Sequence, residues 1–96
     1  MTRGFLLTVL ASSAYLAASA TVAGAADPKF CKQYAQAAVN QVRGGLSNPG
    51  CAGGLQGARW SPDFSVHYQW CLGASFGATG AERDARTQYL RGCAGH

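Results

Sequence analysis

Residues 57–71 read GARWSPDFSVHYQWC, and the fold is best predicted outward from this stretch. It contains both tryptophans of the protein, the only internal histidine and one of the four cysteines. Ser61 is a good N-cap, Pro62 suits the first helical position, and Asp63 would meet the positive end of a helix. The stretch therefore predicts a helix that starts at Ser61 and Pro62 and ends near Leu72 and Gly73.

A second helix is predicted before this stretch. Asp27 is a good N-cap, and Pro28 suits the first helical position. From residue 30 to residue 42 the chain follows helical spacing, and one face collects Phe30, Cys31, Tyr34, Ala35, Ala38 and Val42. Val39 falls outside that face, and Gly44 with Gly45 signals the end of the helix. The glycine-rich residues 46–59, with an NPG turn at 48–50, predict an irregular connector.

A third helix is predicted after the central stretch. Residues 79–82 read TGAE, which is a capping-box pattern that begins a helix at Thr79. The helix is expected to end at Gly92 or Cys93. Its apolar stripe is predicted to consist of Ala81, Ala85 and Tyr89, with Leu90 and Cys93 beside it. Glu82 and Arg86 are spaced as an i,i+4 ion pair.

The N-terminus has the pattern of a secretory signal peptide. One arginine precedes an apolar run that begins at Phe5, and Ala23-Gly24-Ala25 has the small residues that signal peptidase reads. Cleavage is predicted after Ala25. Residues 1–25 are then the signal peptide and residues 26–96 the mature domain, which is expected in the periplasm or secreted, without a stable membrane span.

Four cysteines lie in the predicted mature chain: Cys31, Cys51, Cys71 and Cys93. An even number in a short exported chain predicts two disulfides. If three helices run up, down and up, Cys31 meets Cys71 and Cys51 meets Cys93, which is the favoured pairing. A reversed second helix would instead pair Cys31 with Cys93 and Cys51 with Cys71. Zinc binding is disfavoured because neighbouring cysteines are at least 20 positions apart, whereas thiolate ligands usually come in close pairs.

The fold class predicted from these features is all-α, a small three-helix, disulfide-stapled domain. Residues 26–96 carry seven basic and four acidic side chains, hence a net charge of +3. Such a charge favours solubility and only weakly indicates an anionic partner. Export and the absence of a basic stripe disfavour nucleic acid as a partner, and no phosphate-binding or dinucleotide-binding motif is present, so no cofactor is predicted.

The candidate binding residues are Arg59, Trp60, His67 and Trp70. Aromatic faces stack on sugars and other flat apolar groups, and arginine offers a fork of donors to carboxylate or phosphate. The alternative is that the aromatic residues form the core of a small domain, an interpretation favoured for Trp60. For Trp70, core and binding surface are about equally expected, because its position is on the flank of the predicted helix.

Catalysis is disfavoured by the sequence. Asp63 and His67 have helical i,i+4 spacing and resemble half of an acid–base device. A nucleophile is then needed, but all four cysteines are expected in disulfides, and Ser61 and Ser65 lack a nucleophile-elbow pattern. A metal site at His67 lacks a second ligand. No catalytic and no metal-binding residue is therefore predicted.

Several motifs follow one another along the predicted mature chain: Cys31-x2-Tyr34, Ala38-Val39-x-Gln41, Cys51, Gly57-x-Arg59-Trp60, His67-x2-Trp70-Cys71 and Cys93. This pattern resembles that of a group of small exported, cysteine-containing proteins and domains of alphaproteobacteria. The resemblance implies a bacterial envelope protein and supplies neither a substrate nor a catalytic residue. We expect a non-catalytic binding or accessory module, with a protein or glycan of the envelope as partner. The alternative is a secreted effector or inhibitor that acts on another protein.

Overall fold

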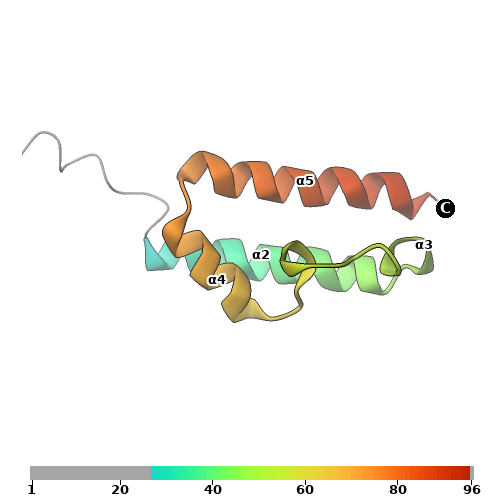
Figure 1. Cartoon of the computed structure of the whole chain (residues 1–96), viewed down its shortest axis with the longest axis horizontal. Helices are drawn as coiled ribbons and strands as arrows, with labels where there is room; N and C mark the ends of the chain where they lie inside the picture. Colours follow the sequence, from blue (N-terminus) through green and yellow to red (C-terminus); the bar gives the residue numbers. More distant parts are fainter. Residues whose placement is uncertain (1–26, 96) are drawn as a thin grey trace, which may run out of the picture.

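The computed structural model describes residues 27–95, and all regular secondary structure in this part of the chain is helical (Figure 1). The predicted signal peptide, residues 1–25, lies outside the described residues. The elements follow in the order α2 (Pro28–Leu46), α3 (Pro49–Ala52), the 3₁₀ turn η2 (Ala58–Trp60), α4 (Phe64–Gly73) and α5 (Phe76–Ala94). The all-α, disulfide-stapled domain predicted from the sequence is confirmed.

The three long helices run up, down and up. In Figure 1, α2 and α5 run in the same direction, while the connector returns along α2 and leads into α4, which runs back toward the start of α2. Helix α4 packs mainly against α2, whereas α5 has fewer contacts with α2 and is joined to α3 at its far end. Helix α2 is therefore the central element of the domain.

Helix α2 begins where predicted and ends later than predicted. The Asp27 carboxylate caps it by accepting a hydrogen bond from the Lys29 N–H at 3.0 Å. The helix continues through Gly45 to Leu46. A Cβ atom at Gly45 would lie 2.7 Å from Leu55 and 2.8 Å from Leu90, so this glycine allows close packing and does not end the helix.

Val39 was predicted to fall outside the buried face of α2, and this prediction is wrong: the side chain is buried. An isolated surface helix has one apolar face. Helix α2 is covered by α4 and η2 and also by α5, so its buried arc is wider than a single stripe.

Helix α4 begins two residues later than predicted. Asp63 is the N-cap, and its carboxylate accepts a hydrogen bond from the Ser65 N–H at 2.9 Å. Ser61 precedes the helix in extended conformation, as expected for a residue before proline, and its hydroxyl accepts a hydrogen bond from the Asp63 N–H. Both Ser61 and Asp63 are cap-forming residue types, and the second of them takes the role. The end at Gly73 agrees with the prediction.

Helix α5 begins at Phe76, so the predicted start at Thr79 is wrong. Ser75 is the N-cap, and its hydroxyl accepts a hydrogen bond from the Ala78 N–H at 3.0 Å. Thr79 lies inside the helix and is buried, and its hydroxyl donates to the Phe76 carbonyl at 2.7 Å. Two serine/threonine residues compete for the cap, and the earlier one, Ser75, lengthens the helix by about one turn.

The predicted apolar stripe of α5 is also wrong. Ala81 and Tyr89 are exposed, and the buried side chains of the helix are Thr79 and Arg86. Glu82 and Leu90 are partly buried on the same face. The face that α5 turns toward the rest of the domain is therefore largely polar.

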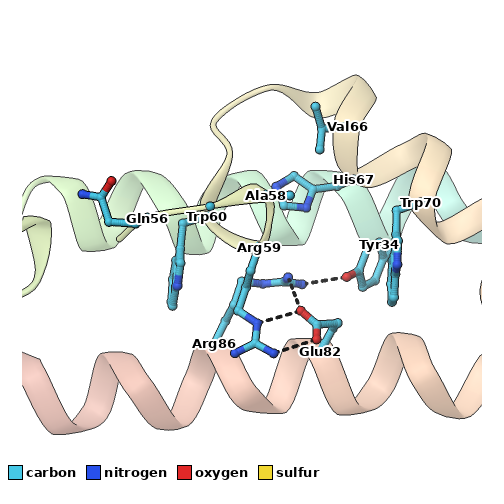
Figure 2. A pocket seen from close by; sticks show the side chains of 11 residues that line it. Tyr34, Gln56, Ala58, Arg59, Trp60, Val66, His67, Trp70, Glu82 and Arg86 are labelled. Atoms are coloured by element: carbon cyan, nitrogen blue, oxygen red, sulfur yellow. Dashed lines mark hydrogen bonds and ion pairs between the residues drawn. The ribbon is translucent and has the colours of Figure 1, made fainter. Parts of the chain in front are cut away.

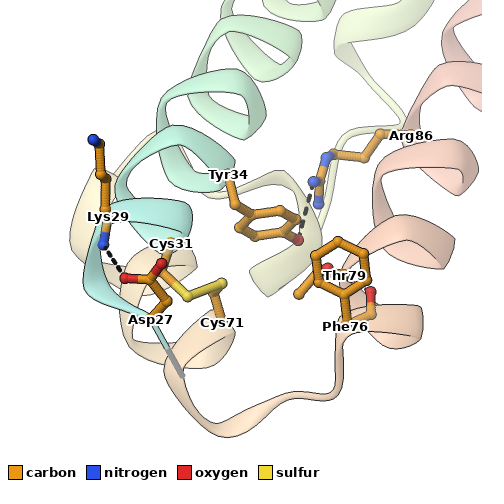
Figure 3. The surroundings of a disulfide bond; sticks show 8 residues. All are labelled: Asp27, Lys29, Cys31, Tyr34, Cys71, Phe76, Thr79 and Arg86. Atoms are coloured by element: carbon orange, nitrogen blue, oxygen red, sulfur yellow. Dashed lines mark hydrogen bonds between the residues drawn. A yellow bond between two sulfur atoms is a disulfide. The ribbon is translucent and has the colours of Figure 1, made fainter. Parts of the chain in front are cut away.

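The two disulfides are Cys31–Cys71 and Cys51–Cys93, which is the pairing favoured from the sequence. The first joins the start of α2 to the end of α4 and packs with Tyr34 in one small core (Figure 3). The second joins α3 to the end of α5. A separate core of Val42, Leu55 and Trp60 lies against Leu90. Two disulfides in so small a domain are typical of an oxidising compartment outside the cytosol.

Candidate functional site

A cleft of about 460 Å³ lies between α2, η2, α4 and α5 (Figure 2). This volume is within the range of sites that hold small organic ligands. Its walls contain all four residues that the sequence predicted for binding, together with seven others. The lining residues are Tyr34, Gln56, Gly57, Ala58, Arg59, Trp60, Val66, His67, Trp70, Glu82 and Arg86.

The two tryptophans have different environments. Trp60 is only 8 % exposed, belongs to the core with Val42, and its ring centroid lies 5.4 Å from that of Tyr89. Trp70 is 43 % exposed, and its ring centroid lies 5.7 Å from that of Tyr34. Trp60 therefore forms part of the core at one end of the cleft. Trp70 presents aromatic surface to water at the other end (Figure 2).

His67 is a packed residue of the cleft wall. It is 3 % exposed, and its Nε2 lies 2.7 Å from the carbonyl oxygen of Ser61. Because a carbonyl only accepts, Nε2 carries the hydrogen. The Asp63 carboxylate is hydrogen-bonded to the backbone and hydroxyl of Ser65 instead of to the imidazole. Asp63 thus caps α4, and His67 contacts the loop that precedes the helix, although the two residues have i,i+4 spacing.

Arg59 forms a two-pronged ion pair with Glu82 across the cleft. Its Nε and Nη2 donate to Oε1 and Oε2 at 2.8 and 2.9 Å. The hydrogen bonds from Arg59 hold the pKa of Glu82 below its ordinary value of 4.5, although partial burial acts in the opposite direction. The charges of Arg59 and, more weakly, Arg86 act in the same direction as the hydrogen bonds. Glu82 is therefore ionised at neutral pH.

Arg86 is a buried residue of the cleft that sequence reasoning missed as a candidate. Its side chain is 1 % exposed, although arginine is rarely buried without partners. Nε donates to the Gln41 side-chain oxygen at 2.7 Å, and Nη2 donates to the Tyr34 hydroxyl at 3.1 Å. Nη1 lies 3.8 Å from Glu82 Oε1, which is an ion-pair distance but too long for a hydrogen bond.

Gln41 holds the buried arginine in place. Its side-chain nitrogen donates to the Thr87 hydroxyl at 2.9 Å and to the Arg83 carbonyl at 3.3 Å. These two bonds orient the amide so that its oxygen faces Arg86. The guanidinium is thus fixed from α2 by Gln41 and Tyr34, whose ring centroid lies 5.3 Å from Arg86 Cζ.

A signal for Arg86 was present in the sequence. Cys93 must face the domain in order to form a disulfide, and residues three, seven and eleven positions before it share its helix face. Those positions hold Leu90, Arg86 and Glu82. If the register of α5 is taken from Cys93, Arg86 is predicted on the helix face that points into the domain.

The cleft has an excess of positive charge. The Arg–Glu–Arg cluster (Arg59, Glu82 and Arg86) has a net charge of +1, and Glu82 is the only acidic residue among those that line the cleft. Asp27 and Asp63 cap helices, and Asp84 is exposed beside Arg83. The cluster can therefore accept an anion. Among the lining residues there is no serine, threonine or cysteine that would serve as a nucleophile.

Comparisons with protein-family models, with curated proteins and with solved structures give no match to the chain. Within residues 27–95, no helix has the length and apolar character needed to cross a membrane. No group of three or more metal-ligating side chains occurs in the same residues.

The lowered pKa of Glu82 predicts how stability depends on pH. A carboxylate with a folded-state pKa below its unfolded value stabilises the fold above about pH 4.5, and this contribution is lost as the pH falls through the folded pKa. Glu82→Gln should therefore lower the free energy of unfolding by about 1 kcal/mol at neutral pH. The difference from wild type should shrink on acidification.

Urea unfolding of both proteins between neutral and acidic pH measures this difference. Asp84→Asn is the matched control, because Asp84 is an exposed acid on the same helix with a single ion pair at 3.5 Å. A gap between wild type and Glu82→Gln that stays constant down to the acid transition would contradict the prediction.

Proposed function

We propose that this protein is a non-catalytic binding module of the bacterial cell envelope, exported to the periplasm or medium, whose cleft holds a ligand. The observation that carries the proposal is the position of Trp70. Its half-exposed ring lines the same cleft as Arg59, Glu82 and Arg86. An aromatic surface beside fixed charged groups is the usual composition of a small-ligand site.

Export is supported by three independent features. The N-terminal residues have the pattern of a signal peptide. The four cysteines form two disulfides, which persist in oxidising compartments. The motifs around Arg59 and Trp70 resemble those of small exported alphaproteobacterial proteins. Together they favour the bacterial envelope as the place of action.

The alternative is an effector or inhibitor that acts on another protein. Helix α4 contains no Asp, Glu, Lys or Arg, and Phe64 and Val66 are each more than one third exposed on it. An exposed apolar helix surface of this kind can dock a protein. Phe64 stacks on Tyr68 and does not line the cleft, so the two hypotheses can be tested with different residues.

Trp70→Ala is expected to abolish ligand capture and leave the helical fold intact. Fully buried aromatic residues cost about 3–5 kcal/mol when truncated, and the half-exposed Trp70 should cost about 1–2 kcal/mol. The measurement is thermal unfolding together with capture of components from a bacterial envelope extract, identified by mass spectrometry.

Phe64→Ala is the matched control, because it truncates an aromatic residue of similar exposure on the same helix. It should retain capture. If Phe64→Ala loses a captured protein while Trp70→Ala retains it, the effector hypothesis replaces the cleft-binding hypothesis.

A further inference from the structure

We propose that the ligand of the cleft is an organic carboxylate with a flat apolar group. Its carboxylate binds the guanidinium groups of the Arg–Glu–Arg cluster, and its flat group stacks on Trp70. This inference rests on the proposed binding function and assigns the chemical class of the ligand.

The first support is the charge of the cluster. Two guanidinium groups share the single carboxylate of Glu82, and the better hydrogen bonds of that carboxylate go to Arg59. Arg86 is buried, and a buried cation without a full counter-charge is unfavourable. Within residues 27–95, its Nη1 has only the 3.8 Å contact to Glu82. A ligand carboxylate would supply the missing negative charge.

The second support is the shape of the existing ion pair. Arg59 holds the Glu82 carboxylate through two nearly equal hydrogen bonds, of 2.8 and 2.9 Å. This is the fork geometry with which arginine binds planar two-oxygen anions. The Arg59 side chain is about half exposed, and its pair with Glu82 is therefore weak enough to exchange. A ligand carboxylate can replace or join Glu82 on the same guanidinium.

The third support is the surface next to the cluster. The Trp70 ring and Val66 lie on the α4 side of the cleft, across from the arginines (Figure 2). A ligand with its carboxylate at the cluster would place its body against this apolar wall. Flat groups stack well on an indole face.

A cationic ligand is disfavoured by the same geometry. It would have to bind Glu82, which already accepts two hydrogen bonds from Arg59, and it would add positive charge beside two guanidinium groups. Phosphate esters also accept two hydrogen bonds from one guanidinium, but they are tetrahedral and bulkier than the planar carboxylate that Glu82 presents to Arg59. They are therefore a matched comparison in the test.

The test uses the exported, disulfide-bonded protein and one ring system with four substituents. The probes are 2-naphthoate, 2-naphthamide, 2-naphthylmethylamine and 2-naphthyl phosphate. Two-dimensional NMR follows the indole N–H signals of Trp60 and Trp70 during each titration. We expect 2-naphthoate to shift the Trp70 signal saturably, with a Kd about tenfold below that of the neutral amide.

Three variants make the test specific. Arg59→Gln should weaken 2-naphthoate about tenfold, because a charge-assisted pair is lost. Glu82→Gln should strengthen it, because the competing internal carboxylate is removed. Arg91→Gln is the control, since Arg91 is exposed and does not line the cleft. This substitution changes the net charge by the same amount as Arg59→Gln. It should leave the Kd unchanged. Titration with the dipeptide Ala-Phe, with its C-terminal amide as the control that lacks the carboxylate, shows whether a peptide C-terminus can take the place of the free acid 2-naphthoate, and either source of the carboxylate supports the proposal.

The possible failures are distinguishable. If the amide, the amine or the phosphate binds as tightly as 2-naphthoate, or if Glu82→Gln weakens the acid, the carboxylate assignment is wrong and the cleft remains a binding site. If no probe shifts the Trp70 signal and Trp70→Ala retains full capture from envelope extract, both the ligand class and the proposed function are wrong.

Discussion

Replacing Cys31 and Cys71 together by alanine is expected to leave the domain largely unfolded at room temperature. The bridge joins residues 40 positions apart. Cross-linking a loop of that length lowers the entropy of the unfolded chain by an amount equivalent to about 4 kcal/mol. A domain of about 70 residues rarely has more than about 3–5 kcal/mol of stability from its core. The stability that is lost with the bridge is therefore about as large as the whole stability that the core provides.

Packing adds to the effect of this bridge. Both cysteines are fully buried in the core with Tyr34, and α4 packs mainly against α2. Helix α4 has only ten residues, and isolated helices of that length are marginal in water. Without the bridge, α4 and the cleft wall that it supplies are expected to detach first.

Far-UV circular dichroism and thermal unfolding measure the outcome. The control is the second bridge, with Cys51 and Cys93 replaced by alanine. Its sequence separation is 42, so the entropic effect is similar, but Cys93 is partly exposed and less core is lost. We expect the protein without the Cys51–Cys93 bridge to lose less stability than the protein without the Cys31–Cys71 bridge. A Cys31→Ala/Cys71→Ala protein that melts within about 4–8 °C of wild type would have lost only about 1 kcal/mol, and the prediction would be wrong.

The features that were predictable from the sequence depend on neighbours along the chain. Asp27 and Pro28 begin α2 through a local cap, and the end of α4 follows from Gly73. The disulfide pairing followed from the order of three helices and the position of each cysteine on them. Where two cap-forming residues stood close together, as with Ser75 and Thr79, the local signal was ambiguous and the prediction of the helix start was wrong.

The interior of the cleft was not predictable in the same way. Arg86 is held by Gln41 and Tyr34, which are 45 and 52 positions away in the sequence. No local pattern encodes such contacts, and the side chain of an arginine on a helix with many polar residues is normally expected to face solvent. The candidate residues Arg59, Trp60, His67 and Trp70 were found because residue type and closeness in sequence place them on one short segment. The register of Cys93 could have placed Glu82 and Arg86 on the inner face of α5, but the contacts of these residues with α2 and η2 are visible only in the tertiary structure.

The burial of Arg86 leads to the second large expected effect. Arg86→Met keeps an unbranched side chain in place but removes the donor to the Gln41 oxygen and to the Tyr34 hydroxyl. Buried acceptors without a partner are unfavourable, and the loss of both bonds should lower the free energy of unfolding by about 3 kcal/mol. Arg86→Lys should be nearly as harmful, because an ammonium cannot reproduce the fork that reaches both acceptors. Chemical denaturation monitored by circular dichroism measures the loss.

Two further proteins show whether the loss comes from the unpaired acceptors. Arg83→Met alters an exposed arginine on the same helix and should change stability by less than about 0.5 kcal/mol. A triple variant, Arg86→Met with Gln41→Leu and Tyr34→Phe, removes both acceptors and should recover most of the stability, because apolar replacement of a buried polar network is often neutral or stabilising. The recovered protein should still fail to bind 2-naphthoate, since the buried cation is absent. If Arg86→Met is as stable as Arg83→Met, the guanidinium does not organise the centre of this fold.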